Sequence, residues 1–354
     1  MRILIAVLAL VAALIGLATY GPGALDAMRL DPPPPDPALE ALYDRPVTHE
    51  RLERPDLHGA EDLEPGPDGR LYASLADGRI MAREPGPDGT WTEIADTGGR
   101  PLGLAFAPDG SLFVADALRG LMHHTDTGWE TWIASAQGGG PLVFADDLTV
   151  LEDGRIVMTD ASLRHGYGAY ITSFFEGEQT GRVLLVTGPE EFTEIAGGLG
   201  FINGIDHDPE TGLVYINETW TGRIWQLDPE TGEMSVLVEG LPGYPDNLHF
   251  DSETGLIWSA LPSPRATDLE ALHPRPFVKR LAWRWIQVAG LPDLPPRPAM
   301  AIAVDTDGRP VHALIELVTE GAEGATSVVV WEGELWVAGL DRDGVAVFAV
   351  PDAE

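Results

Sequence analysis

Short apolar segments recur from about residue 50 to the C-terminus, and a glycine turn follows many of them. Alternating aliphatic and aromatic residues come directly after several of these turns, as in Leu71-Tyr72 and Leu112-Phe113. This combination of turn chemistry and alternation predicts β-hairpins. Six turns share one frame, and their glycines are Gly69, Gly110, Gly154, Gly212, Gly255 and Gly333.

The spacings between these glycines are 41, 44, 58, 43 and 78 residues, and a period in the forties is typical of a four-stranded propeller blade. The two longer intervals contain a loop at about 163–180 and an insertion at about 262–298. Within the insertion, residues 281–286 are compatible with a short helix or a strand. We therefore predict an all-β fold, a six-bladed β-propeller over residues 50–354. The alternative, a β-sandwich with many similar hairpins, does not account for the shared register of the turns.

The N-terminus has the pattern of a targeting element. Arg2 precedes an apolar run over 3–18, close to the roughly 17–25 residues of a membrane span, and no clean small-x-small site follows it. We expect residues 1–20 to be an uncleaved signal anchor, with a cleaved signal peptide as the alternative. Both predict an exported protein, periplasmic or extracellular, held at a membrane by the anchor or secreted. The Pro-rich residues 21–49 are expected to form a stiff stalk or linker.

Composition narrows the possible chemistry. The chain has no cysteine, which excludes disulfides, thiolate nucleophiles and thiolate metal sites. Acidic residues outnumber basic ones by 56 to 22, for a formal charge of −34, so nucleic acid is not an expected partner. A surface of this charge is compatible with simple solubility. The expected partners are a small molecule and, through the anchor, a membrane; the sequence does not tell whether the protein has protein partners.

The shared frame also aligns one polar position upstream of the turns. In a propeller, the first strand of each blade lines the central channel, so equivalent residues of these strands form a ring. The ring position lies two residues before an apolar residue of each first strand. Its six occupants are Glu61, Leu102, Asp146, Asn203, Asp246 and Thr326.

Four of these six residues carry side-chain oxygens, and three are carboxylates. Carboxylates pointed at one axis repel one another unless they bind a cation or shift their pKa. Oxygen ligands without His or Cys favour calcium or magnesium, and an irregular set with a neutral amide suits calcium. Asp and Asn also cap turns through backbone hydrogen bonds. A single such residue is more simply read as a cap, but four in register predict a Ca²⁺ site.

Several segments resemble the strictosidine-synthase-like proteins, within the wider superfamily of senescence marker protein, gluconolactonase and paraoxonase. The likeness covers about residues 50–350, and its motifs are specific as a set. Two of them are Phe201-Ile202-Asn203-Gly204 and Tyr244-Pro245-Asp246-Asn247. The segments are 99–104, 112–117, 144–148, 158–162, 201–205 and 241–247.

The resemblance implies a six-bladed, calcium-binding propeller with metal ligands at the ring, and a membrane-associated member of the group. The implied metal ligands are Glu61, Asp146, Asn203 and Asp246, with Asn247 as a neighbour or further ligand. Many lactonase relatives have Asn at the position of Asp146, so this chain carries an additional negative charge there.

At two positions the chain lacks a catalytic residue of its better-known relatives, so their mechanisms cannot be carried over to it. Leu102 stands where paraoxonases have a catalytic His, and residues 326–330 lack the Glu that strictosidine synthase uses in its last blade. Alkaloid condensation is therefore not expected. We expect instead a calcium-dependent hydrolase of lactones or esters, with Asp246 or Asp147 as the base that accepts a proton from water. The alternative is a non-catalytic propeller that calcium stabilises and that serves as a binding scaffold.

Overall fold

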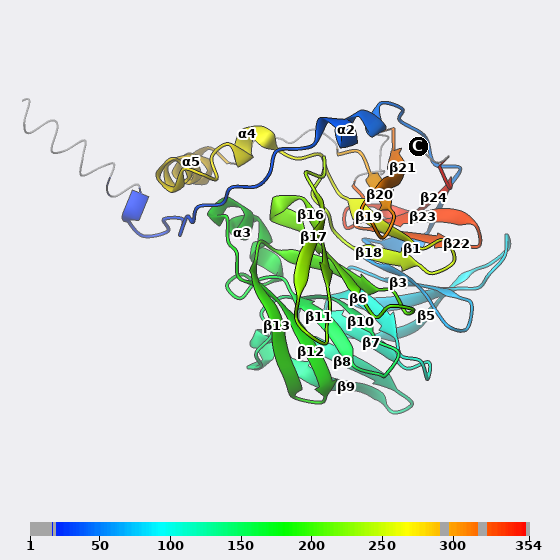
Figure 1. Ribbon diagram of the computed structural model, residues 1–354. Coiled ribbons are helices and arrows are strands. Elements are labelled where there is room, and N and C mark those ends of the chain that lie inside the picture. Colours follow the sequence, from blue (N-terminus) through cyan, green and yellow to red (C-terminus); the bar gives the residue numbers. More distant parts are fainter. Residues whose placement is uncertain (1–15, 17–18, 291–296, 318–323, 352–354) are drawn as a thin grey trace, which may run out of the picture.

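The computed structural model describes residues 16, 19–290, 297–317 and 324–351, and it has the six-bladed architecture that the repeat predicts (Figure 1). Six four-stranded antiparallel sheets follow one another along the chain. The first strand of each sheet contacts the first strands of both neighbouring sheets, which closes the circle around the channel. These six inner strands are β2 (Leu63–Pro65), β6 (Pro101–Phe106), β10 (Ala145–Val150), β14 (Ile202–His207), β18 (Leu248–Asp251) and β22 (Ser327–Trp331).

The other strands complete the blades in sequence order. The second strands are β3 (Leu71–Ser74), β7 (Leu112–Asp116), β11 (Ile156–Asp160), β15 (Val214–Glu218), β19 (Leu256–Leu261) and β23 (Glu334–Ala338). The third strands are β4 (Arg79–Arg83), β8 (Gly120–Thr125), β12 (Gly181–Gly188), β16 (Arg223–Leu227), β20 (Met300–Val304) and β24 (Asp343–Ala349). The outer strands are β5 (Trp91–Asp96), β9 (Gly128–Ala134), β13 (Glu191–Leu199), β17 (Met234–Glu239), β21 (Pro310–Ile315) and, in the last blade, β1 (Arg51–His58).

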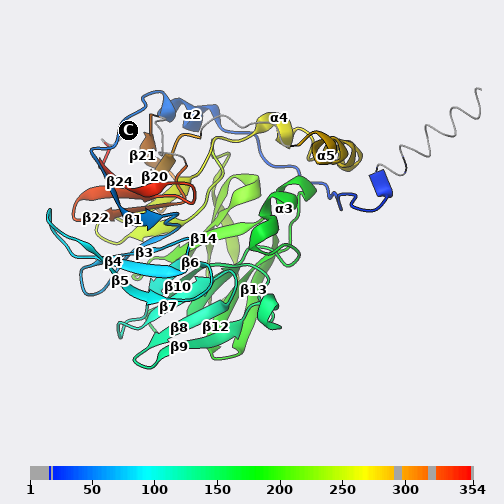
Figure 2. The ribbon, with the colours of Figure 1, turned by 180° about the vertical axis from the view of Figure 1, so that it is seen from behind.

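Strand β1 closes the propeller from the N-terminal side. It pairs antiparallel with β24, in a register that places Arg51 opposite Val347 and Glu53 opposite Val345. The last blade therefore contains three strands from the C-terminal end of the chain and one from its beginning (Figure 2). This pairing ties the two ends of the propeller together and leaves no gap in the ring of blades.

The six turn glycines connect each inner strand to the second strand of its blade, as the sequence predicts. All six adopt positive φ, between 71° and 89°. A Cβ added at any of these six would meet no atom within 4 Å. Glycine is therefore favoured by the left-handed backbone itself, which other L-residues adopt at a cost, and not by lack of space.

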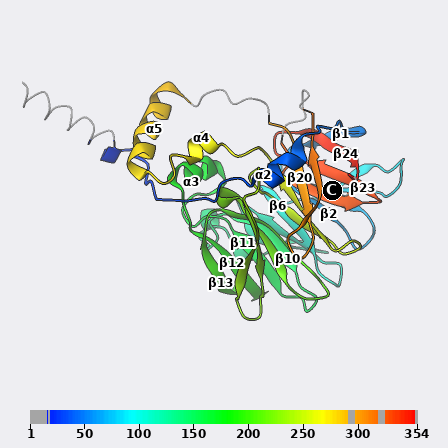
Figure 3. The same cartoon turned by 45° about the horizontal axis from the view of Figure 1, so that its top comes forward.

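Helices occupy the connections between the second and third strands of two blades. The loop in the third blade contains α3 (Tyr170–Glu176), and the insertion in the fifth blade contains α4 (Thr267–Glu270) and α5 (Pro276–Ala289). Residues 281–286, compatible with either structure in sequence, are thus helical. The three helices gather on one side of the propeller (Figure 3), and Lys279 Nζ of α5 donates to the carbonyl oxygen of Glu176 at 2.7 Å. Because inner strands begin at this end, the helices cover the end where the ring residues lie.

The Pro-rich segment differs from the stalk that we expected. Residues 21–49 run along the surface of the propeller, where Leu25, Leu30 and Leu39 are buried. The Asp36 amide donates to the Gly240 carbonyl at 2.8 Å, close to α2 (Pro37–Glu40). An extended Pro-rich chain leaves its carbonyls and apolar rings free to pack, so composition alone did not distinguish a packed segment from a free spacer.

The predicted anchor in residues 1–20 lies almost entirely outside the described residues. Within the part of the chain that the structure describes, no helix is both long enough and apolar enough to cross a membrane.

Candidate metal centre

The six ring residues lie at the start of the inner strands, at the end of the channel that the helices cover. Leu102, Asp146 and Asn203 are within β6, β10 and β14, while Glu61, Asp246 and Thr326 come one or two residues before β2, β18 and β22. All six are buried, including the three carboxylates. The strand order therefore brings together the positions that the repeat frame aligned.

Three ring side chains have an oxygen that nothing in the described structure satisfies. These buried atoms are Glu61 Oε2, Asp146 Oδ2 and Asn203 Oδ1, and none has a hydrogen-bond partner. A buried polar atom without a partner costs about 1–3 kcal/mol, so three at one place require an explanation. Their chemistry, two carboxylates and an amide carbonyl, is that of a hard-cation site.

The carboxylates are also close enough to destabilise one another's charged forms. Burial raises the pKa of Glu61 well above its usual value, and the charge of Asp246 raises it further. The pKa of Asp146 is raised well above its usual value by burial, then by the charges of Glu61 and Asp246. A divalent cation among them would remove this penalty, because it supplies the opposite charge that the channel lacks.

Asp246 has the mildest shift of the three. Burial raises its pKa to about 7, while a hydrogen bond from the Asn203 side chain lowers it. Since Asn203 Oδ1 is without a partner, its amide nitrogen is the donor in this pair. Asn203 is thus oriented with its amide toward one predicted ligand and its carbonyl oxygen free.

Asn247 lies beside the ring and holds Glu61. Its side-chain nitrogen donates to Glu61 Oε1 at 3.0 Å and to the Glu61 carbonyl at 3.1 Å. Thr326 Oγ1 donates to the same carbonyl at 2.7 Å. Two residues from the fifth and sixth blades therefore orient Glu61 of the first blade, and Asn247 supports a predicted ligand through its nitrogen.

The ring is wider than the coordination shell of one ion. Among the described residues, Glu61, Asp146 and Asp246 do not bring one oxygen each within 4.8 Å of the other two. Mutual repulsion of the carboxylates is a sufficient cause of this spread. The residues fit a divalent cation by their oxygen chemistry and by the three buried atoms without partners, and binding would require their oxygens to move inward.

Asp147, the second candidate base, has a different environment. Its Oδ1 accepts from the Leu148 amide at 2.8 Å, and its Oδ2 accepts from the Ile205 amide of the next blade at 2.8 Å. Asp62 repeats this pattern, with Oδ2 accepting from the Leu104 amide at 3.0 Å. These carboxylates join adjacent inner strands, and both oxygens of Asp147 are already occupied by backbone donors.

The channel continues below the ring as a small polar cavity of about 20 Å³. The charged and polar residues along it include Asp62, Glu64, Asp147 and Asp206. Above the ring, toward the helices, the surroundings are apolar. Residues of one buried cluster there are Leu102, Phe144, Phe174, Phe201 and Trp220, with Tyr244 packed against them. The predicted metal ligands thus lie between an acidic cavity and a buried aromatic cluster.

The sequence did not predict a set of polar residues on the second strands that donate hydrogen bonds to the backbone carbonyls of ring residues. Ser74 Oγ donates to the Leu102 carbonyl at 2.7 Å, and Thr159 Oγ1 donates to the Asn203 carbonyl at 2.9 Å. Asn217 Nδ2 donates to the Asp246 carbonyl at 2.7 Å. Each is the fourth residue of a second strand and supports the ring residue of the following blade. A polar residue recurs at this fixed place in the three strands, but the sequence does not indicate what it contacts.

Two family models match the chain. The SMP-30/gluconolactonase/LRE-like region matches residues 86–269, and the strictosidine synthase-like N-terminal region matches residues 48–83. Protein STRICTOSIDINE SYNTHASE-LIKE 4 of Arabidopsis thaliana is 31% identical over 261 residues, covering 72% of this chain and 70% of the relative. The adipocyte plasma membrane-associated protein of Salmo salar is 34% identical over 263 residues, covering 67% of this chain and 63% of the relative.

Solved structures show the same fold at low identity. A gluconolactonase from Xanthomonas campestris superposes with a TM-score of 0.58 at 17% identity, covering 93% of this chain and 97% of the other. A calcium-binding protein, regucalcin, from Agrobacterium tumefaciens gives 0.57 at 14% identity, covering 86% of this chain and 96% of the other. With the two family matches and the Arabidopsis relative, these findings show that the chain belongs to the SMP-30/gluconolactonase/LRE-like family and to its strictosidine synthase-like group.

Proposed function

We propose that this protein is a calcium-dependent hydrolase of lactones or esters, with its active site at the ring. The observation that carries the proposal is the set of three buried oxygens without partners, Glu61 Oε2, Asp146 Oδ2 and Asn203 Oδ1. Together with Asp246 they form a hard-ligand set on four blades, and the gluconolactonase-like family supports hydrolysis of a cyclic or linear ester. When bound, a calcium ion would polarise the substrate carbonyl as a Lewis acid.

The residues of the chain have distinct tasks in this proposal. Glu61, Asp146 and Asn203 hold the cation, and Asp246 contributes an oxygen and accepts the proton of the attacking water. Asp246 suits that exchange because it lies in the ring beside the proposed cation ligands, where the Asn203 side chain is its hydrogen-bond partner. Asp147 is less suited, since backbone amides occupy both of its oxygens.

The aromatic cluster above the ring supports a substrate with an apolar part. Phe144 and Phe201, two residues before Asp146 and Asn203, pack at 5.2 Å between ring centroids. Leu102 occupies the ring itself and is buried with them in the same cluster. An aryl ester or a lactone with an alkyl chain would place its apolar group there and its carbonyl at the ring.

A panel of aryl esters and lactones tests the proposal, with wild type and Asp246→Ala assayed in calcium and in chelator. We expect hydrolysis by wild type in calcium only, and a loss of at least about 100-fold in Asp246→Ala. Glu84→Gln, a substitution of an exposed acidic residue, is the control. The alternative is a binding scaffold in which calcium only pins the blades. It is favoured if no substrate is hydrolysed while chelation still lowers the melting temperature.

A further inference from the structure

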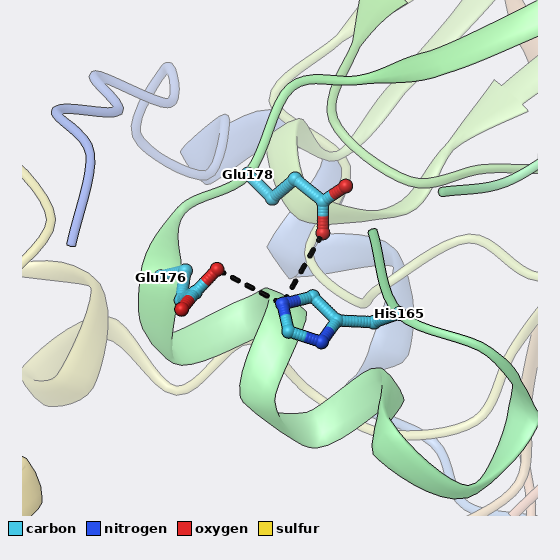
Figure 4. Close-up of side chains that lie close together, drawn as sticks. All are labelled: His165, Glu176 and Glu178. Carbon is cyan, nitrogen blue, oxygen red and sulfur yellow. Dashed lines mark hydrogen bonds and ion pairs between the residues drawn. The ribbon is translucent and has the colours of Figure 1, made fainter. Parts of the chain in front are cut away.

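A second group of possible metal ligands lies outside the ring, in the loop of the third blade (Figure 4). His165 precedes α3, Glu176 ends it, and Glu178 follows it. Each offers one ligand atom, and these three atoms lie within 4.8 Å of one another. Among the described residues, they form the only such group of three His, Asp or Glu side chains. The side chain of His165 is only 17% exposed.

The three side chains converge on one nitrogen. His165 Nε2 lies 2.9 Å from Glu176 Oε2 and 3.8 Å from Glu178 Oε2, and both glutamates point toward the imidazole (Figure 4). Ligands of a tetrahedral ion with bonds of about 2.0–2.1 Å are separated by roughly 3.3 Å. The two measured separations lie on either side of this value, so small side-chain rotations suffice to accommodate an ion.

An orphaned buried atom at this place points independently to a ligand. Glu178 is 1% exposed, and its Oε2 has no hydrogen-bond partner in the described structure. Its other oxygen, Oε1, is fixed by the hydroxyls of Ser162, at 2.8 Å, and Thr180. The carboxylate is therefore held with Oε2 directed at His165, 3.8 Å from its Nε2, and without a hydrogen-bond partner among the described residues.

The loop is also organised around these ligands. Ser162 Oγ accepts from the His165 amide at 2.8 Å, the same hydroxyl that donates to Glu178. The Glu176 carboxylate accepts from the Asp26 amide at 3.0 Å through its other oxygen. Both glutamates thus keep one oxygen bound within the protein and present the second to the imidazole, as supporting hydrogen bonds do at metal sites.

One positively charged side chain, that of Arg164, lies beside the three ligands. Arg164 Nη2 is 3.3 Å from Glu176 Oε2, but it is also 2.7 Å from Asp26 Oδ2. The shorter pairing with Asp26 gives the guanidinium a partner that it keeps if an ion takes Glu176 Oε2. Arg164 therefore compensates one of the two glutamate charges without closing the position in front of Glu178.

We propose that His165, Glu176 and Glu178 bind a transition-metal ion of the zinc class, with the remaining position open to water. One imidazole and two carboxylates suit zinc or cobalt, whereas calcium prefers a larger shell made of oxygens alone. This site shares no ligand with the ring. An ion here would fix the end of α3, and through the Lys279 contact to the Glu176 carbonyl it would hold α5 over the channel mouth.

The test uses the full chain, stripped of metal and then kept in excess calcium so that calcium competes for the ring. Titration with Zn²⁺ is followed by calorimetry, and Co²⁺ serves as a visible probe of a tetrahedral N/O site. We expect one equivalent of Zn²⁺ per chain and a Co²⁺ absorption band that Zn²⁺ abolishes. His165→Ala and the near-isosteric Glu178→Gln are each expected to weaken binding at least about 100-fold.

Two control variants separate this site from the rest of the protein. His124→Ala removes a half-buried histidine of β8, away from the loop, and Asp146→Asn alters only the ring; both are expected to retain the Zn²⁺ equivalent. The proposal is overturned if wild type takes up no stoichiometric Zn²⁺. It is also overturned if His165→Ala and Glu178→Gln, folded by circular dichroism, bind Zn²⁺ as tightly as wild type. In that case His165 serves only as an ion-pair partner of the two glutamates.

Discussion

The side-chain amide of Asn217 donates to the backbone carbonyl of Asp246 at 2.7 Å, so the fourth blade positions a predicted ligand of the fifth. The same nitrogen lies 2.9 Å from Ser259 Oγ, the corresponding residue of the fifth blade's second strand. Ring geometry is therefore set partly by buried polar residues one strand away from the channel. An orienting contact of this kind affects both stability and metal affinity.

We expect Asn217→Ala to lower the free energy of unfolding by about 1–3 kcal/mol, because it removes hydrogen bonds in a buried place. Calcium affinity should fall about 10–100-fold, since Asp246 loses its backbone support. Ser259→Ala is the matched control, because it removes a contact of Asn217 but none of Asp246. Urea unfolding and calcium calorimetry measure the two effects. Equal calcium affinity in wild type and Asn217→Ala would show that the contact does not position the ligand.

Glu61→Gln should have opposite effects with and without calcium. At pH 8 in chelator, the variant is expected to melt at a higher temperature than wild type, because one of three mutually repelling buried charges is gone. In calcium, wild type should gain stability and the variant should gain little. Glu84→Gln, at an exposed site, controls for loss of charge in general. If calcium raises the melting temperature of wild type and Glu61→Gln equally, Glu61 is not a ligand.

The raised pKa of Asp246 predicts that the stability of the calcium-free protein depends on pH. Its pKa rises from 3.8 to about 7 on folding, so between these values the folded state holds a proton that the unfolded state has released. The contribution of Asp246 to the free energy of unfolding is therefore fully present below pH 3.8, and it is lost as the pH rises through 7. Relative to Asp246→Asn, wild type should lose roughly 2–4 kcal/mol between pH 4 and pH 8. Urea unfolding in chelator measures this difference, and a constant difference across the range would contradict it.

Substitutions at Gly154 test whether the left-handed backbone conformation explains why glycine occupies the six turns. Its φ is +85°, and an added Cβ would meet nothing within 4 Å, so Gly154→Ala should cost about 1–2 kcal/mol from conformation alone. Gly154→Asn should cost less, because Asn tolerates the left-handed region. Gly168→Ala, equally open but without positive φ, should change the melting temperature little. Similar losses for Gly154→Ala and Gly168→Ala would argue against a special turn conformation.

The fold followed from the sequence because its determinants are local. The turn after each inner strand has a glycine at positive φ, and six such turns, three of their five intervals in the forties, specify six blades. The ring residues could be predicted from the same spacing, because equivalent positions of the inner strands meet at the channel. The predicted metal ligands Glu61, Asp146, Asn203 and Asp246 are accordingly buried at corresponding places.

Other features depend on contacts that no local pattern encodes. Ser74 and Thr159 read as ordinary polar positions of a strand, and only the packing of neighbouring blades reveals that they support ring carbonyls. His165 meets its glutamates because a short helix folds the loop back on itself. The Pro-rich segment was expected to be a stalk, and it packs on the propeller because the propeller surface offers partners such as the Gly240 carbonyl.

Calorimetric titration of the metal-stripped full chain with Ca²⁺ at pH 8 measures whether the ring binds calcium. We expect one saturable site in wild type, with affinity lost in Asp146→Ala and Asn203→Ala but kept in His165→Ala, whose imidazole lies in the other cluster. Asp146 Oδ2 and Asn203 Oδ1 are the partnerless atoms that these two variants remove. Absence of a saturable Ca²⁺ site in wild type, or full affinity in both ring variants, would contradict the account.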